Sequence, residues 1–161
     1  MMRILGIDPG LGTTGYGIIE DASFKVIEAG VIKTLPRTPI QERLKKISDA
    51  LTDIVTEYKP GVLVLEKIYS HCKHPTTAIL MGHARAVACL ICGEKNIKLV
   101  NYPSTRIKKA VTGNGHASKQ QVQRMVQTLL NLRKAPEPVD VSDALAMAIS
   151  YCFIEQKRRI F

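Results

Sequence analysis

Three strand-like runs follow one another near the start of this chain, before any helical pattern appears. They cover residues 4–8, 16–20 and 25–34, and short links separate them. Successive strands with such short links pair as an antiparallel meander. The chain is therefore expected to build part of an antiparallel sheet before its first helix.

The hydrophobic period then changes, and helices alternate with strands. Apolar residues recur at helical spacing from Ile40 to Tyr58, and Thr38 and Pro39 predict an N-cap followed by the first helical residue. The later expected elements are strands at 62–66 and 97–101, and helices at about 75–94, at 104–111, from a capping box at 118–121 onward, and at about 140–156. This order predicts an α/β fold with a mixed five-stranded sheet, its first three strands antiparallel, flanked by helices.

The totals favour a single domain that binds a polyanion. The 161 residues suit one domain, expected over residues 1–156, with a short basic tail at 157–161. Lys and Arg number 23 against 14 Asp and Glu, and the net charge of +9 favours nucleic acid as partner over a merely basic surface. We see no secretory signal and no apolar run of about 20 residues, and the four cysteines suit a reducing compartment, so a cytoplasmic protein outside the membrane is expected.

Acidic residues stand at two strand ends and at one helix start. Asp8 ends the first strand, Glu66 ends the fourth, and Asp140 and Asp143 share one face of the first turn of the last helix. If the first and fourth strands are parallel neighbours, a helix start packed beside them brings four carboxylates together. Each acid alone has a structural alternative, as a turn former, a helix cap or a dipole partner. All four together favour a metal site.

A metal site would also explain the basic charge. Gathered carboxylates repel one another, and a divalent cation removes the conflict. Hard oxygen ligands suit Mg²⁺ or Mn²⁺, and two such ions about 4 Å apart activate a water and stabilise the leaving oxygen of a phosphodiester. Lys and Arg would then hold the neighbouring phosphates of the substrate.

The stretch after Asp8 also matches a dinucleotide-binding pattern, G-x-G-x-x-G, at Gly10, Gly12 and Gly15. That fingerprint must open a helix, whereas a strand follows here. The three glycines are instead expected to form a hairpin turn whose small size lets a DNA backbone come close to the metal site.

Several short motifs occur in a specific order and spacing. They are residues 6–10 with 14–17, Glu66 at its strand end, residues 82–85, residues 113–122 and residues 140–146. With these motifs the chain resembles the RuvC family of Holliday-junction resolvases, nucleases of the ribonuclease H-like superfamily, over nearly its whole length.

The resemblance implies that Asp8, Glu66, Asp140 and Asp143 bind two Mg²⁺ or Mn²⁺ ions per active site. It implies a homodimer that cuts two strands of like polarity symmetrically in a four-way DNA junction, leaving 5′-phosphate and 3′-hydroxyl ends. It also implies work beside the RuvA and RuvB branch-migration proteins in recombination and DNA repair.

The resemblance further implies four DNA-binding residues. Lys108 and Lys119 match family lysines that contact or neutralise phosphate, and Tyr69 stands where the family often has a Phe that stacks on an opened base. Arg85, in the motif at 82–85, is the fourth. Two alternatives stay open at this point: another ribonuclease H-like nuclease with a different RNA or DNA substrate, and an ATP-binding protein of the actin or sugar-kinase type. The second alternative needs two such domains, and this chain has the length of one.

Overall fold

The strands of this computed structural model form one mixed sheet, in the order β3–β2–β1–β4–β5. The structure describes residues 1–68 and 75–160, and of residues 156–160 the backbone alone. The strands are β1 Arg3–Asp8, β2 Thr13–Glu20, β3 Val26–Lys33, β4 Val62–Glu66 and β5 Lys98–Tyr102. The first three pair antiparallel, β4 runs parallel to β1, and β5 runs parallel to β4. The predicted mixed five-stranded sheet with an antiparallel start is confirmed.

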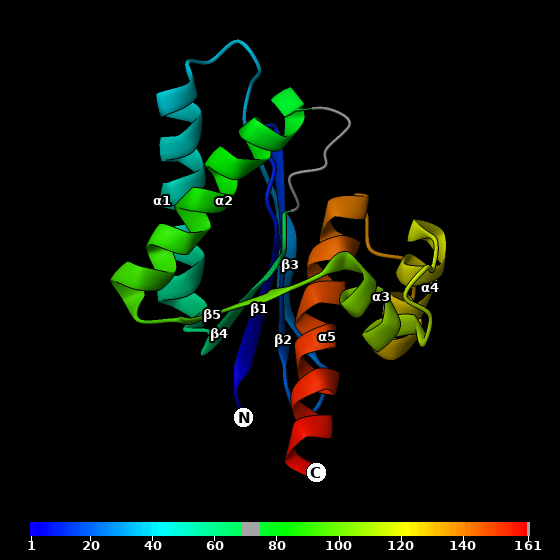
Figure 1. The fold of residues 1–161 in the computed structure, drawn as a ribbon. Coiled ribbons are helices and arrows are strands. Elements are labelled where there is room, and N and C mark those ends of the chain that lie inside the picture. The colour runs from blue at the N-terminus through cyan, green and yellow to red at the C-terminus, as the bar shows by residue number, and fades with distance from the viewer. Residues whose placement is uncertain (69–74, 161) are drawn as a thin grey trace.

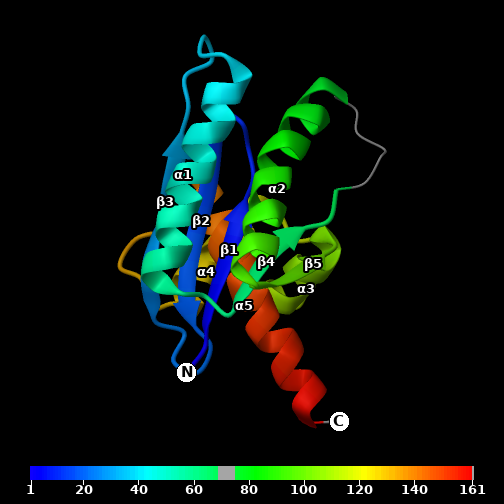
Figure 2. The same cartoon turned by 90° about the vertical axis from the view of Figure 1, so that its left-hand side faces the viewer.

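Helices cover both faces of this sheet. They are α1 Ile40–Tyr58, α2 Pro75–Lys95, α3 Ser104–Thr112, α4 Lys119–Leu129 and α5 Val139–Ile160. Helices α1 and α2 cover one face, and α5 crosses the other with α3 and α4 beside it (Figure 1). Seen from the first face, α1 lies over β2 and β3 while α2 lies over β4 (Figure 2). The sheet is thereby buried between two helical layers.

Each layer has its own core because successive strand residues point to opposite faces. On β1, Ile4 packs in the cluster with α5, and Leu5 packs in the cluster with α1 and α2. On β4, Val64 and Leu65 divide in the same way. The sheet therefore separates the two clusters. The residues at the strand ends point to one face or the other by the same alternation.

Two helix boundaries differ from the sequence-based expectation. Thr38 does not cap α1: Pro39 is the residue before the helix, with φ −53° and ψ 145°, and no side chain caps the turn. The extended ψ of Pro39 keeps it outside the helix, so the predicted cap position is displaced by one residue. Helix α5 continues to Ile160, past the expected end near Gln156 and through most of the predicted tail. The capping box of α4 is confirmed, with Ser118 and Gln121 each bonding the backbone of the other.

Among the described helices, α2 alone is long and apolar enough to cross a membrane, judged by length and composition only. Ala84, Ala88, Ile91 and Cys92 of this helix pack in the core against the sheet. Core helices of globular proteins pass the same test, so α2 is weak evidence for a membrane span.

Candidate active site

The acids at the ends of β1 and β4 lie at the same edge of the sheet. The two strands are parallel neighbours, as predicted, with Ile4 opposite Val62 and Gly6 opposite Val64. Parallel strands have their carboxyl ends at the same edge of the sheet, so Asp8 at the end of β1 lies near Glu66 at the end of β4. The pairing alone therefore gathers two of the four predicted acids.

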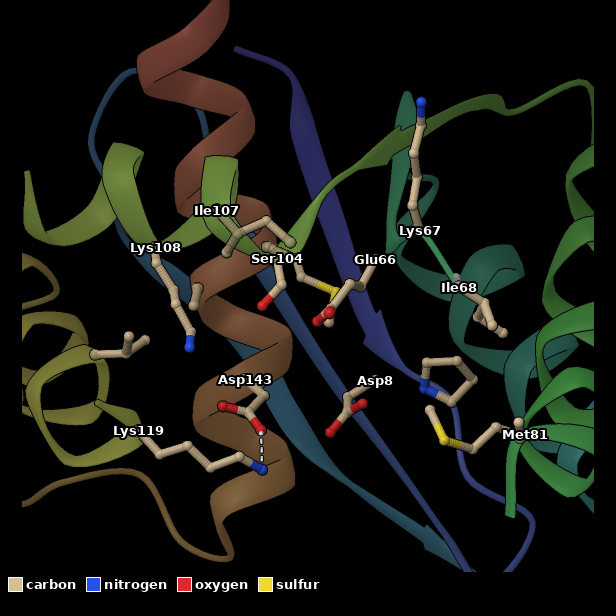
Figure 3. A pocket seen from close by; sticks show the side chains of 15 residues that line it. Asp8, Glu66, Lys67, Ile68, Met81, Ser104, Ile107, Lys108, Lys119 and Asp143 are labelled. Carbon is tan, nitrogen blue, oxygen red and sulfur yellow. Dashed lines mark ion pairs between the residues drawn. The ribbon is translucent and has the colours of Figure 1, made fainter. Parts of the chain in front are cut away.

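Strand alternation turns both of these acids toward α5. On β1, Ile7 packs on the α1–α2 side, and Gly6 lies against the backbone of α5, so Asp8 also faces α5. On β4, Leu65 packs on the α1–α2 side, and Glu66 therefore faces the opposite way. Both side chains point into the space beside α5 in Figure 3.

The start of α5 comes close because the strands beneath it carry glycine. A Cβ added to Gly15 would lie 2.2 Å from the carbonyl oxygen of Asp140, and one added to Gly6 would lie 1.9 Å from that of Ala144. Neither distance is possible for a real side chain, so these glycines are required for the helix to dock where it does. The first turns of α5 are thus fixed on β1 and β2, and Asp140 and Asp143 with them.

This packing corrects the interpretation of the glycine stretch. Gly15 lies within β2, opposite Asp8, rather than in a hairpin turn. It accommodates α5, so close approach of DNA is not what requires glycine there. Only Gly12 is exposed and has open space around it, whereas a Cβ on Gly10 would meet the carbonyl oxygen of Thr13 at 2.4 Å.

Three of the four predicted acids line one cavity of about 450 Å³. Its lining residues are Asp8, Pro9, Glu66, Lys67, Ile68, Ala78, Met81, Ser104, Ile107, Lys108, Lys119, Val122, Asp143, Ala146 and Met147. Asp140 is not among them, but it is close enough to raise the pKa of Asp8. It lies within the first turn of α5, after Val139, so it is not the cap that the structural alternative required.

Burial and mutual repulsion make these carboxylates hard to ionise. The pKa of Asp8 rises from 3.8 to about 7, first through burial and then through the negative charges of Asp143 and Asp140. Burial also raises the pKa of Asp143, opposed mainly by Lys119, and the pKa of Glu66, opposed mainly by a hydrogen bond with Ser104. The cavity therefore stores unfavourable negative charge that a cation would relieve.

Two lysines face these acids from α3 and α4. The Nζ atom of Lys119 lies 3.8 Å from a carboxylate oxygen of Asp143, and Lys108 points toward the same space (Figure 3). Lys67, which follows Glu66, also lines the cavity, but its ammonium points away from the acids in this view. Both lysines predicted to contact DNA thus stand at the site, while their role stays a prediction.

Of the two remaining predicted DNA contacts, the structure describes Arg85 alone, and it lies away from the cavity lining. Arg85 does not line it, and its guanidinium donates a hydrogen bond to the side-chain oxygen of Asn101 on β5. Tyr69 lies outside the described residues. Sequence reasoning missed Ser104, whose hydroxyl bonds Glu66, because a Ser at a helix start is expected to serve that helix.

In the part of the chain that the structure describes, no three His, Cys, Asp or Glu side chains are placed closely enough to hold a metal ion. The acids share a cavity without converging on one point. Repulsion among them favours this spread arrangement, and Lys119 is drawn toward Asp143.

Comparison with known protein families assigns the chain to one of them. The family model described as crossover junction endodeoxyribonuclease RuvC matches residues 4–151. The chain belongs to the RuvC family. This membership confirms the prediction of an endodeoxyribonuclease, a hydrolase.

Relatives of the same family are similar to this chain over most of the length of both proteins. A crossover junction endodeoxyribonuclease RuvC of Rhodopirellula baltica is 47% identical over 151 residues, which are 92% of this chain and 84% of that protein. The protein of the same description from Alkaliphilus oremlandii is 47% identical over 152 residues, covering 93% of this chain and 92% of its own.

Solved structures show the same fold. Thermus thermophilus RuvC in complex with a Holliday junction substrate aligns with a TM-score of 0.90 and 27% identity, covering 98% of this chain and 97% of that chain. A yeast mitochondrial Holliday junction resolvase aligns with a TM-score of 0.67 at 15% identity, over 99% of this chain and 81% of that chain, which shows the fold alone. The predicted ribonuclease H-like fold is confirmed.

Proposed function

We propose that this chain resolves four-way (Holliday) DNA junctions by hydrolysing phosphodiesters in two strands of like polarity, in recombination and DNA repair. The observation that carries the proposal is the acidic cavity at the edge of the sheet. Asp8, Glu66 and Asp143 come from three separate elements, and Lys108 and Lys119 line the same cavity. The relative from T. thermophilus, crystallised with a Holliday junction, supports the choice of substrate.

The same cavity fits divalent metal ions, and we propose Mg²⁺ or Mn²⁺, two ions per site. Its donors are carboxylate oxygens, the ligands that these hard cations prefer, and burial together with the charges of Asp143 and Asp140 raises the pKa of Asp8, which a bound cation would oppose. Asp8, Glu66, Asp140 and Asp143 would hold the ions after small side-chain movements. When bound, such ions lower the pKa of water and stabilise the leaving oxygen.

The residues of the chain would divide the remaining work. Lys108 and Lys119 would bind the phosphates beside the scissile one, so that the strand is held across the acids. Cleavage on the 3′-oxygen side of the phosphorus would leave 5′-phosphate and 3′-hydroxyl ends. Buried Ile107, Val122 and Met147 form the apolar part of the wall and would limit the water around the reacting group.

Symmetric cleavage of two strands requires two sites, and we propose a homodimer. The outer face of α2 offers a surface for the second copy, because Ile79 and Leu90 are 62% and 61% exposed and Ala86 lies between them. Leu90→Glu should give monomers in sedimentation experiments, whereas Leu35→Glu, at a still more exposed leucine in the loop before α1, should not. Cooperation with RuvA and RuvB, a cytoplasmic location, and one nuclease domain over residues 1–156 belong to the same proposal.

The variant Asp8→Asn tests the proposed chemistry. It should lose cleavage of a synthetic four-way junction by a factor of about 1,000 or more, because a metal ligand is removed. Junction binding should persist, since binding depends on the basic residues. Asp53→Asn, exposed on α1, is the matched control and should cut normally. An Asp8→Asn variant with wild-type cleavage would overturn the site.

Substrate choice separates the proposal from the alternative of another ribonuclease H-like nuclease. The wild-type protein is offered a four-way junction, a linear duplex of the same sequence and an RNA–DNA hybrid. We expect paired nicks in the junction and little cleavage of the other two. Preferential cleavage of the hybrid would favour the alternative.

A further inference from the structure

Arg43 of α1 is held against the loop that follows Asp8. The Nε atom of Arg43, in the first turn of α1, donates a hydrogen bond of 2.8 Å to the hydroxyl of Thr34. That hydroxyl in turn donates to the carbonyl oxygen of Leu11, and the backbone N–H of Thr34 donates to the carbonyl oxygen of Gly12 over 3.0 Å. Thr34 is only 7% exposed, so the chain of bonds is shielded from water. Arg43 is thereby held in place against the loop at residues 9–12.

The guanidinium is held at an open part of this loop. Gly12 is exposed, and a Cβ added to it would meet one described atom within 4 Å, Nη2 of Arg43 at 3.9 Å. The terminal nitrogens of Arg43 thus border a spot where the backbone of the chain carries no side chain. A second backbone can approach there without a steric barrier.

Its hydrogen-bonding capacity is largely unused. A guanidinium has five N–H donors, and the described contacts of Arg43 use one of them. Among the residues that the structure describes, no carboxylate forms an ion pair with it. A partly buried arginine with one neutral partner is suited to bind an anion with two parallel hydrogen bonds.

We propose that Arg43 binds a backbone phosphate of the DNA strand beside the acidic cavity. The inference rests on the proposed function. Pro9 lines the cavity, and Gly12 is three residues further along the loop, at most about 11 Å of chain. Successive phosphates of one strand are about 3.4 Å apart along a duplex axis, so the contact lies within about three nucleotides of the scissile phosphate. Thr34 is the positioning residue that holds Arg43.

Binding measured against salt concentration tests the contact. Affinity for a synthetic four-way junction is determined in EDTA, so that no strand is cut, between about 50 and 200 mM salt. Arg43→Ala and Arg43→Gln should each reduce the slope of log K against log salt by about 0.9, the value for one phosphate. Lys59→Gln removes one exposed charge at the other end of the same helix and should leave the slope unchanged. Arg43→Gln still offers a donor to Thr34, so it guards against an unfolded Ala variant.

Thr34→Val tests the positioning. It keeps the charge of Arg43 but removes the hydroxyl that orients it, so affinity should fall about threefold with the slope unchanged. Wild-type slopes in both Arg43 variants would overturn the phosphate contact, even if cleavage slowed, because Arg43 would then only fix the loop. Wild-type affinity in Thr34→Val would overturn the role of Thr34. A wild-type protein without affinity for the junction would instead overturn the proposed function.

Discussion

The two faces of the sheet are covered at different distances. On one face, α5 lies directly on the strands, since Gly6, Gly15 and Gly17 would each clash with it if they carried a Cβ. Ala144 and Ala148 of α5 lie against Gly6, and both are completely buried. This helix brings two acids to the site.

On the other face, longer side chains separate the helices from the sheet. Ile47 and Leu51 of α1 and Ile91 of α2 fill that layer. Gly82 and Gly93 of α2 have no atom within 4 Å of an added Cβ. This layer contributes Ala78 and Met81 to the cavity wall, and its outer surface includes the exposed Ile79 and Leu90 of α2.

The difference shows where the fold can change without harm to the site. Close backbone contact leaves no room for α5 to shift on the strands. Carboxylates that bind one ion must be held in place with this accuracy. The α1–α2 layer is held by hydrophobic area, which tolerates repacking. Substitutions on the two faces should therefore have effects of very different size.

Gly15→Ala should have the largest effect on stability. The new Cβ would overlap the backbone of Asp140, so α5 must shift or β2 must bend, and we expect a loss of about 3 kcal/mol or more in the free energy of unfolding. Gly82→Ala on α2 is the control, with a gain of about 0.5–1 kcal/mol from helix propensity. Urea unfolding of both variants measures the contrast, and equal small changes would show that α5 is not held closely.

Asp8→Asn should stabilise the metal-free protein at high pH by about 2 kcal/mol. The pKa of Asp8 rises from 3.8 in the unfolded chain to about 7 in the folded one, so the folded state binds the proton more tightly. The wild type therefore loses stability as pH increases from about 4 to about 7, and Asn removes this loss. Solvent screens part of the repulsion, which keeps the gain in the free energy of unfolding at about 2 kcal/mol.

Thermal unfolding in EDTA at pH 5 and pH 8 measures this effect. Asp53→Asn, on the α1–α2 side, should follow the wild type at both pH values. A wild type that becomes more stable from pH 5 to pH 8, with no difference from Asp8→Asn, would contradict the repulsion argued for the acidic cavity.

Lys108→Ala should slow cleavage about tenfold at saturating protein, because one charge-assisted contact near the reacting phosphate is worth about 1.4 kcal/mol. Lys119→Ala should behave in the same way. Lys109 is the matched control, since it follows Lys108 on α3 but does not line the acidic cavity. Equal losses in Lys108→Ala and Lys109→Ala would mean that general basic charge is sufficient.

The order of the strands and helices was predictable from the sequence, because the spacing of apolar residues indicates each element. Asp8 and Glu66 each end an apolar run, and the sequence predicts that they meet at one edge of the sheet if their strands are parallel neighbours, which they are. The close docking of α5 was not predictable, because a glycine in a strand has the same letter whether it faces a helix, a turn or DNA. Gly15 was assigned to the turn for this reason.

Contacts between distant segments were the second kind of feature that the sequence could not predict. Thr34 lies in the connection that follows β3, Arg43 lies nine residues later in the first turn of α1, and the path of this connection brings them together. The hydroxyl of Ser104 could have capped its own helix, yet α3 has no side-chain cap. Its partner is Glu66, on the strand next to β5.

Ser104→Ala should have the smallest of these effects. Its hydroxyl holds the Glu66 carboxylate and lowers its pKa against the effect of burial, so its removal leaves Glu66 free to rotate. One such hydrogen bond is worth about 1 kcal/mol, and cleavage should slow about fivefold. The loss should be greatest at low Mg²⁺ concentration and nearly absent at saturating Mg²⁺, because a misplaced ligand weakens metal binding before it changes the chemistry. Ser104→Thr keeps the hydroxyl and should restore the wild-type metal requirement, and Thr105→Ala, exposed beside it, should leave it unchanged. A Ser104→Ala variant with the wild-type Mg²⁺ dependence would show that β4 alone, without α3, orients Glu66. The helices on the α5 side of the sheet would then position fewer of the acids than we argue.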